Sequence, residues 1–260
     1  MKDLVKRTAD RFNIGITTSS HLEELEELNR AYASLDSVLG FGGPRATELL
    51  KHLRSSRSEL RQDLFVLSEL GLKQNGFFVE FGATDGVHMC NSYLLEKEFG
   101  WKGILAEPAR CWHRALKSNR RCTIETACVW RESNSTLTFN EVAGERELST
   151  LNSHSASDSH ARSREKGTTY TVETISLEDL LDKHQAPKVI DYLSIDTEGS
   201  EYEILSNFNF ARYQFRIITC EHNYSPKREK IFALLTENGF TRKFEQYSHF
   251  DDWYVQAALD

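Results

Sequence analysis

The chain has 260 residues, of which 39% are hydrophobic and 27% are charged, so its composition is that of a folded globular protein rather than a disordered one. Its formal net charge of -7 argues against a nucleic-acid partner, because affinity for a polyanion depends on clustered Lys and Arg. A chain of this length can bury one sizeable core, which favours one main domain with an appendage.

The five cysteines are scattered and form no CxxC pair, which is typical of reduced cytoplasmic thiols. The first residues, Met1 to Arg7, contain no apolar segment of the kind found in a secretory leader. No stretch approaches the roughly 20 apolar residues that a membrane-spanning helix needs. We therefore expect a cytoplasmic protein that does not insert into a membrane.

Residues 1–75 are predicted to form a helical N-terminal extension, and residues 76–260 the main domain. Leucines recur at helical spacing in two stretches, separated by the turn-like segment Gly40 to Pro44. The leucines are Leu22, Leu25 and Leu28 in the first stretch and Leu60, Leu64 and Leu67 in the second. We expect these helices to cap the domain and to carry any homo-oligomer contact.

The strongest pattern in the chain is Phe77 to Gly86, an apolar run that ends in two glycines and two acids. It predicts a buried strand that opens into a ligand-binding turn. A second apolar run ends at Glu107-Pro108, 21 residues after Gly86, where an acid can accept hydrogen bonds from ribose hydroxyls. Glu80 lies inside the first strand, where a carboxylate needs a partner, so we assign it to the site. The turn lacks a full GxGxxG, which favours an adenosine ligand without a pyrophosphate, such as S-adenosylmethionine.

From Phe77 onward, short apolar runs alternate with helical patterns, which predicts an α/β fold with a parallel sheet. Further strands are expected near residues 103–107, 122–127, 189–196 and 216–221. Two last strands, at 241–246 and 253–257, are too close in sequence for a crossover helix and should pair antiparallel. The polar stretch between Glu141 and Thr169 is predicted to be an insertion over the sheet that acts as a substrate-facing lid, anchored by Leu148 and Leu151.

Acidic and imidazole side chains follow two of these strands. Asp196 ends the first and is followed by Glu198, while Glu221 and His222 end the next. Ligands of open α/β sheets bind at this edge, and a histidine there could accept a proton from a substrate hydroxyl. The same four residues could instead hold a divalent cation, with Asp196, Glu221 and His222 as the principal candidates.

Several of these motifs, in this order, resemble the FkbM-type S-adenosylmethionine-dependent methyltransferases over residues 58–257. The matching segments are Phe78 to Gly86, Asn91 to Glu96, Ile104 to Pro108, Ser194 to Glu201 and Glu221 to Asn223. The resemblance implies a Rossmann-like class I methyltransferase, with an open, mostly parallel seven-stranded sheet and a C-terminal antiparallel hairpin. Residues 1–57 lie outside it.

Carried onto this chain, the resemblance implies that residues at the ends of several strands contact the cofactor. Gly82, Asp85, Gly86 and Ser92 would surround the methionine and ribose, Glu107 and Pro108 the ribose, and Ala127 and Cys128 the adenine. Asp196 would face the methyl-transfer site, with His222 or Glu198 as other proton acceptors. The implied reaction is O-methylation of a hydroxyl on a glycan or a related natural product. The alternative is a cofactor-binding module without turnover that acts through a protein partner.

Overall fold

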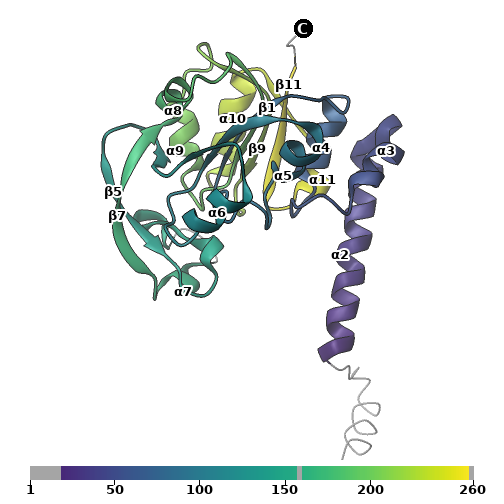
Figure 1. Ribbon diagram of the computed structural model, residues 1–260, viewed down its shortest axis with the longest axis horizontal. Coiled ribbons are helices and arrows are strands. Elements are labelled where there is room, and N and C mark those ends of the chain that lie inside the picture. The colour runs from purple at the N-terminus through teal and green to yellow at the C-terminus, as the bar shows by residue number, and fades with distance from the viewer. Residues whose placement is uncertain (1–18, 157–159, 258–260) are drawn as a thin grey trace, which may run out of the picture.

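The computed structural model describes residues 19–156 and 160–257, and its centre is a seven-stranded sheet (Figure 1). The strands follow the spatial order β10-β11-β9-β8-β1-β2-β3. Their bounds are β1 Phe77–Phe81, β2 Lys102–Ala106, β3 Thr123–Glu125, β8 Val189–Ile195, β9 Gln214–Glu221, β10 Phe240–Lys243 and β11 Asp251–Gln256. The five neighbouring strands β9, β8, β1, β2 and β3 are parallel to one another. Strand β11 pairs antiparallel with both β9 and β10.

The α/β class and the mostly parallel sheet are thus confirmed. Each strand begins or ends within a few residues of the predicted range. The segment between β10 and β11 holds only the one-turn helix α11, Glu245–Ser248, which is too short for a crossover.

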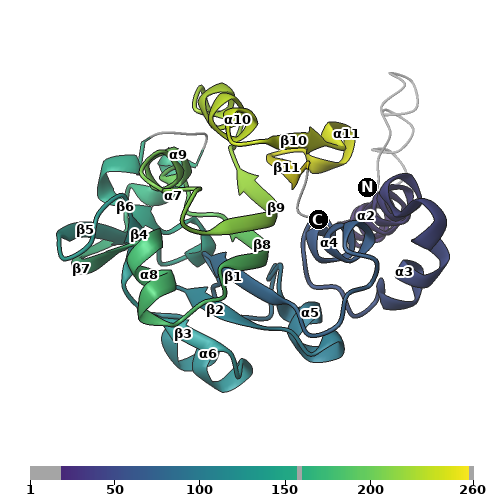
Figure 2. The ribbon, with the colours of Figure 1, turned by 90° about the horizontal axis from the view of Figure 1, so that it is seen from above.

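Neighbouring residues along each strand face two separate cores, because side chains alternate across a sheet. On β1, Phe78 packs into one core and Val79 into the other, and Tyr192 and Leu193 do the same on β8. Helices cover both faces (Figure 2). One face is covered by α8 Leu177–Lys183, α9 Glu201–Ser206 and α10 Arg228–Glu237, and the other by α4 Gln62–Glu69, α5 Tyr93–Phe99 and α6 His113–Asn119.

The predicted insertion is largely ordered, and it belongs to a second sheet that sequence reasoning did not anticipate. This sheet has the order β4-β7-β5-β6 and lies to one side of the central sheet in Figure 1. Its strands are β4 Cys128–Trp130, β5 Thr136–Glu141, β6 Thr150–Leu151 and β7 Thr168–Ser176, with η2 Arg146–Leu148, η3 Asn152–His154 and α7 Ala161–Arg164 between them. The alternation of polar and apolar residues along Thr168–Ser176 is the sequence pattern that indicates a strand in this second sheet.

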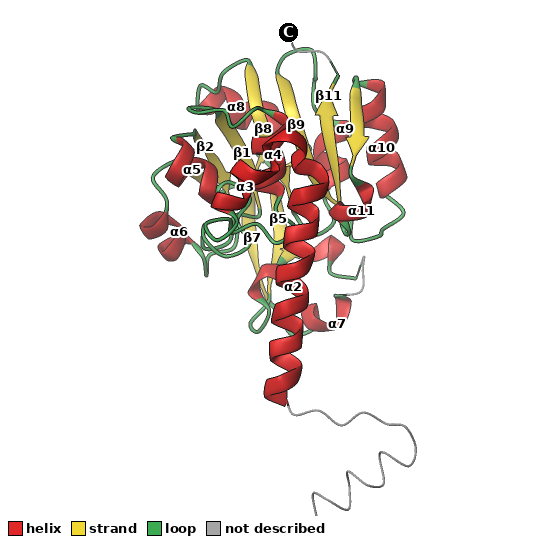
Figure 3. Ribbon diagram, turned by 90° about the vertical axis from the view of Figure 1, so that its right-hand side faces the viewer, coloured by secondary structure: helices red, strands yellow, loops and turns green. Residues whose placement is uncertain are grey.

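The described part of the segment before β1 contains several helices. They are α2 Ser19–Gly42, η1 Gly43–Arg45, α3 Ala46–His52 and α4. The predicted turn begins later than expected, since α2 runs through Gly40 to Gly42. Val38, Phe41 and Leu49 join the same core as Phe78, while the N-terminal part of α2 projects away from the body (Figure 3). Residues 1–18 lie outside the description. Among the described helices, none combines the length and hydropathy that crossing a bilayer would require.

Candidate cofactor and acceptor site

Three acidic residues lie where parallel strands end at one edge of the central sheet. Glu107 follows β2, Asp196 follows β8, and Glu221 is the last residue of β9. All three line one cavity of about 420 Å³. This volume lies within the range of roughly 300–1,000 Å³ that ligand pockets occupy. The sequence prediction that acids of successive strands meet at one rim therefore agrees with the geometry.

The turn after β1 needs glycine because the end of β8 comes very close to it. Gly82 has φ +74°, and a Cβ there would lie 2.0 Å from the backbone oxygen of Asp196. Gly82 lines the cavity. Gly86 has φ +77° but does not line it, and a Cβ there would lie 2.6 Å from the Cγ of Arg120. The second glycine therefore accommodates a buried arginine.

Glu80 lies beneath the cavity and organises the loop that follows the turn. Its carboxylate accepts a hydrogen bond from the backbone N–H of Asn91 at 2.7 Å and further hydrogen bonds from the Ser92 hydroxyl and the Cys90 thiol. Arg120 donates to the Ser92 hydroxyl at 2.9 Å. Neither Glu80 nor Ser92 lines the cavity; Asn91 does. The structure places these two predicted cofactor residues one layer behind the site.

Asp85 also acts within the chain. Its carboxylate accepts hydrogen bonds of 2.8 Å from the backbone N–H groups of both Val87 and His88, so it closes the turn after β1. Asp85 does not line the cavity, whereas His88 and Met89 do. The two latter residues were missed, because nothing in their local pattern separates them from an ordinary exposed loop.

Glu107 has the position and the contacts of a ligand-binding carboxylate. It is buried, it lines the cavity, and each of its oxygens accepts one backbone N–H at 2.8 Å, from Thr84 and from Ala109. A carboxylate has about four acceptor sites, so two remain for a ligand. Burial raises the pKa of Glu107 to about 7, and the negative charge of Asp196 acts in the same direction.

Apolar side chains form the wall of the cavity beside Glu107. Pro108 and Cys128 line it as predicted, whereas Ala127 does not. The other apolar members of this wall are Ala109, Trp112, Val129 and Phe139. Trp112 and Phe139 come from a loop and from the second sheet, which is why the sequence motifs did not include them.

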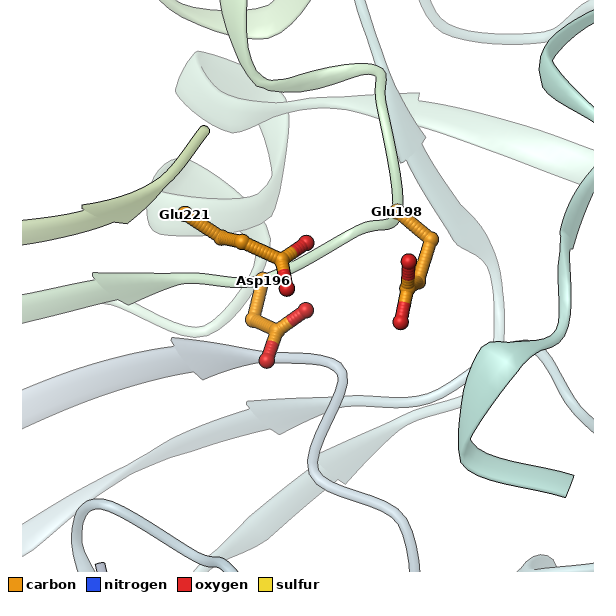
Figure 4. Close-up of side chains that lie close together, drawn as sticks. All are labelled: Asp196, Glu198 and Glu221. Atoms are coloured by element: carbon orange, nitrogen blue, oxygen red, sulfur yellow. The ribbon is translucent and has the colours of Figure 1, made fainter. Parts of the chain in front are cut away.

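Asp196, Glu198 and Glu221 all line the cavity, and their carboxyl groups lie close together (Figure 4). Each offers a carboxylate oxygen within 4.8 Å of the others. The carboxyl groups of Asp196 and Glu221 lie so close together that ionising both would be unfavourable. Burial raises the pKa of both groups, and the negative charge of Asp196 further raises the pKa of Glu221. Asp196 is only half-buried by surface area because it faces the open cavity.

Glu198 differs from this pair because a buried arginine neutralises it. Arg164 Nη2 lies 2.6 Å from Glu198 Oε2, and the Arg164 side chain is completely buried. Arg164 belongs to the insertion, and its Nε also donates to the backbone oxygen of Leu148 at 2.7 Å. The Thr150 hydroxyl adds a hydrogen bond of 2.9 Å to the Glu198 carbonyl. These contacts fasten the insertion onto the loop after β8.

His222 lies outside the cavity, so the structure does not support it as the proton acceptor. Its Nδ1 accepts the backbone N–H of Tyr224 at 2.9 Å, and its Nε2 lies 3.1 Å from the backbone oxygen of Asp251. A neutral imidazole satisfies both contacts, and burial lowers the pKa of His222 accordingly. Adjacent strand residues point to opposite faces, and here Glu221 faces the cavity while His222 faces away.

The carboxylates that could hold a metal ion are therefore Asp196, Glu198 and Glu221, without His222. Of these, Glu198 is already paired with Arg164, so a cation at this cluster would compete with the guanidinium for that carboxylate. A divalent cation stays a prediction.

Residues of the N-terminal extension and the insertion complete the cavity. Glu59 and Gln62 enter from the segment leading into α4, and Leu148 and His160 from the insertion. Leu148 lines the cavity, and Leu151 is buried, so both predicted anchors contact the body. Glu59 and Gln62 were missed because the extension was interpreted as a separate cap.

An open, mostly parallel sheet with a ligand cavity at the carboxyl ends of its strands is the arrangement expected of a class I methyltransferase, and other α/β proteins share it. The family model described as "Methyltransferase FkbM domain" matches residues 80–253, which is more than half of the chain. The protein belongs to this family of S-adenosylmethionine-dependent methyltransferases.

Solved structures of other methyltransferases show a distant likeness. The N-terminal domain of human METTL16 in complex with SAH is 13% identical over 77% of this chain and 70% of that one, with a TM-score of 0.40. The precorrin-6Y C5,15-methyltransferase of Geobacter metallireducens GS-15 is 12% identical over 74% and 86%, with a TM-score of 0.38. The CurJ carbon methyltransferase is 11% identical over 94% and 72%, with a TM-score of 0.39. No curated protein sequence matches the chain significantly.

Proposed function

We propose that this methyltransferase transfers the methyl group of S-adenosylmethionine to a hydroxyl oxygen of a sugar, a glycan or a related natural product. The observation that carries the proposal is the pair of carboxyl groups of Asp196 and Glu221, which lie close together in the cavity and both have raised pKa values. Methyl transfer to a hydroxyl oxygen requires removal of the hydroxyl proton. A pair of carboxyl groups with raised pKa values is suited to accept that proton near neutral pH.

The residues present fit the cofactor. Glu107 offers free acceptor sites for two ribose hydroxyls, and the apolar wall around Pro108 and Cys128 offers a surface for a planar base. Gly82 lines the cavity, and its lack of a side chain lets the turn after β1 pass close to Asp196. Behind them, Glu80 and Ser92 hold the loop that carries Asn91, so we propose that they position the cofactor site without contacting the ligand.

The cofactor supplies an activated methyl group on a cationic sulfur, so the protein mainly aligns the acceptor and removes a proton. The acceptor oxygen forms a bond to the methyl carbon, the carbon–sulfur bond breaks, and its electron pair stays on sulfur. The hydroxyl proton passes to the ionised carboxylate of the Asp196–Glu221 pair. The negative charge of Glu198 raises the pKa of Glu221, and the ion pair with Arg164 offsets part of that charge.

The charge of the cavity indicates which acceptors it admits. Seven acidic side chains line it, and Arg146 is the one Lys or Arg among the lining residues that the structure describes. Glu59, Glu145 and Glu147 face the acceptor from the extension and the insertion. These three side chains are exposed, so water screens part of their charge, but they still disfavour an anionic ligand. We therefore propose a neutral polyhydroxylated acceptor rather than one bearing phosphate or carboxylate groups.

Methyl transfer from labelled S-adenosylmethionine to a panel of free and lipid-linked glycans tests the proposal. The panel should pair each neutral glycan with a carboxylated or phosphorylated analogue, and cofactor binding should be measured in parallel. We expect turnover on neutral members only. Turnover confined to the anionic analogues would refute the acceptor class but not the reaction. Tight cofactor binding without methylation of any member would favour the binding module without turnover.

A further inference from the structure

Helix α2 carries an apolar stripe that the rest of the described chain does not cover. Eight large hydrophobic side chains are exposed among the described residues, and five of them lie on this helix. They are Leu25, Leu28, Tyr32, Leu35 and Leu39, with exposed fractions between 39% and 70%. Concentration of the exposed apolar surface on one helix marks an interaction site, because single exposed apolar residues would be scattered.

The spacing of the stripe is that of a coiled-coil seam. Its members follow one another at intervals of three, four, three and four residues, which are the a and d positions of a heptad repeat. A helix turns by about 100° per residue, so this spacing gathers all five side chains within one narrow sector. The partner that such a seam fits is another α-helix with the same pattern.

The stripe faces away from the protein body. Val38 and Phe41 anchor the C-terminal half of α2 in the core, and the Ser34 hydroxyl accepts a hydrogen bond from Arg61 at 3.1 Å. Ser34 and Phe41 lie on the far side of the helix from the stripe, and Val38 lies at its edge, next to Leu35. A second helix can therefore lie along the stripe without displacing any contact within the chain.

The projecting part of α2 also lacks internal support. Every residue from Leu25 to Ala33 is exposed, and Figures 1 and 3 show this part of the helix standing clear of the body. An isolated helix of this length is only marginally stable in water, and most helical stability in proteins comes from packing of an apolar face. A partner along the stripe would supply that packing.

We infer that two copies of this chain pair antiparallel through this stripe. The N-terminal part of α2 is acidic, with four glutamates at positions 23, 24, 26 and 27. Beyond its C-terminal end, the exposed side chains of Lys51, Arg54 and Arg57 are basic. An antiparallel pair brings the acidic end of each helix toward the basic end of its partner, whereas a parallel pair would bring Glu26 and Glu27 of both copies together.

The pairing is isologous and places Tyr32, the middle member of the stripe, close to the two-fold axis. The buried seam covers only two heptads, so the dimer should be weak and should dissociate on dilution. The same acidic segment disfavours an anionic lipid surface as the occupant.

Analytical ultracentrifugation of the full chain from low to high micromolar concentration tests the pairing. The wild type should shift from monomer to dimer over this range. Tyr32→Glu should remain a monomer, while Arg30→Glu, on the opposite side of the helix, should dimerise like the wild type. Hydrogen exchange at residues 25–33 should slow with protein concentration in the wild type alone. A wild type that stays monomeric throughout, or a Tyr32→Glu variant that still dimerises, would overturn the inference.

The orientation has its own test in the double variant Glu26→Lys, Glu27→Lys. Antiparallel pairing predicts a weaker dimer, because lysines would then face the basic end of the partner. A tighter dimer would establish parallel pairing and contradict the proposed orientation. Cofactor binding should be unchanged in all variants, since none of the substituted residues lines the cavity.

Discussion

Replacement of Glu107 by glutamine tests the assignment of the cofactor half of the cavity. The wild-type carboxylate accepts two backbone N–H groups and keeps acceptor sites for two ribose hydroxyls. Glutamine keeps the shape but turns one acceptor into a donor and removes the charge. Hydrogen bonds to a charged group contribute about 1.5–3 kcal/mol, so the dissociation constant of S-adenosylmethionine should rise roughly 10- to 150-fold.

The pH dependence of binding gives the same assignment a second readout. The pKa of Glu107 is raised to about 7, so the carboxylate is mostly protonated at pH 6 and mostly ionised at pH 8. If the ionised form binds the ribose, affinity should increase about tenfold between these values. Glu107→Gln should lose this component of the pH dependence.

Glu125→Gln is the matched control for both measurements. Glu125 is a buried carboxylate just one strand away, its Oε1 accepts the backbone N–H groups of Thr126 and Ala127, and it does not line the cavity. Isothermal titration calorimetry should show wild-type cofactor affinity for this variant. Wild-type affinity and an unchanged pH profile in a folded Glu107→Gln protein would refute the reasoning.

Four further predictions follow from the site. The methylation rate should rise with pH as the Asp196–Glu221 pair loses a proton, and Asp196→Asn should remove this limb while His222→Ala keeps it, as a pH-rate profile can show. Chelation should leave turnover unchanged if the pair acts without a metal, whereas loss of activity restored by Mg²⁺ would establish a metal site. Burial raises the pKa of Asp251 to about 8, so its ionisation destabilises the folded state as pH rises from about 5 to 8, and Asp251→Asn should gain stability over the wild type across that window in urea unfolding. Hydrogen exchange at residues 149–167 should slow when cofactor and acceptor bind together, and unchanged exchange would show that the insertion is not a lid.

The parts of the site that could be predicted from sequence are those set by strand ends. Glu107, Asp196 and Glu221 each follow or end an apolar run, and parallel strands bring their carboxyl ends to one edge whatever the connections between them. Gly82 was recognisable because a glycine directly after a buried strand signals backbone that approaches another group closely.

The remaining residues depend on contacts that no local pattern encodes. Glu221 faces the cavity, so the next residue, His222, faces away from it. A shift of one residue in the register of β9 would exchange the two orientations, and the sequence does not fix that register. Arg164 reaches Glu198 across 34 positions of sequence, and Gln62 comes from a helix that precedes the first strand. The exposed stripe on α2 was visible in part as Leu25 and Leu28, but only the structure shows that nothing in the described chain covers it.

The most direct test of the account is the mass and linkage of the methylated product. Wild-type protein with S-adenosylmethionine and a neutral glycan should add one methyl group to an oxygen, and Glu221→Gln should bind the cofactor normally yet form little product. Transfer to carbon or nitrogen would contradict the account, as would full activity in Glu221→Gln and Asp196→Asn together.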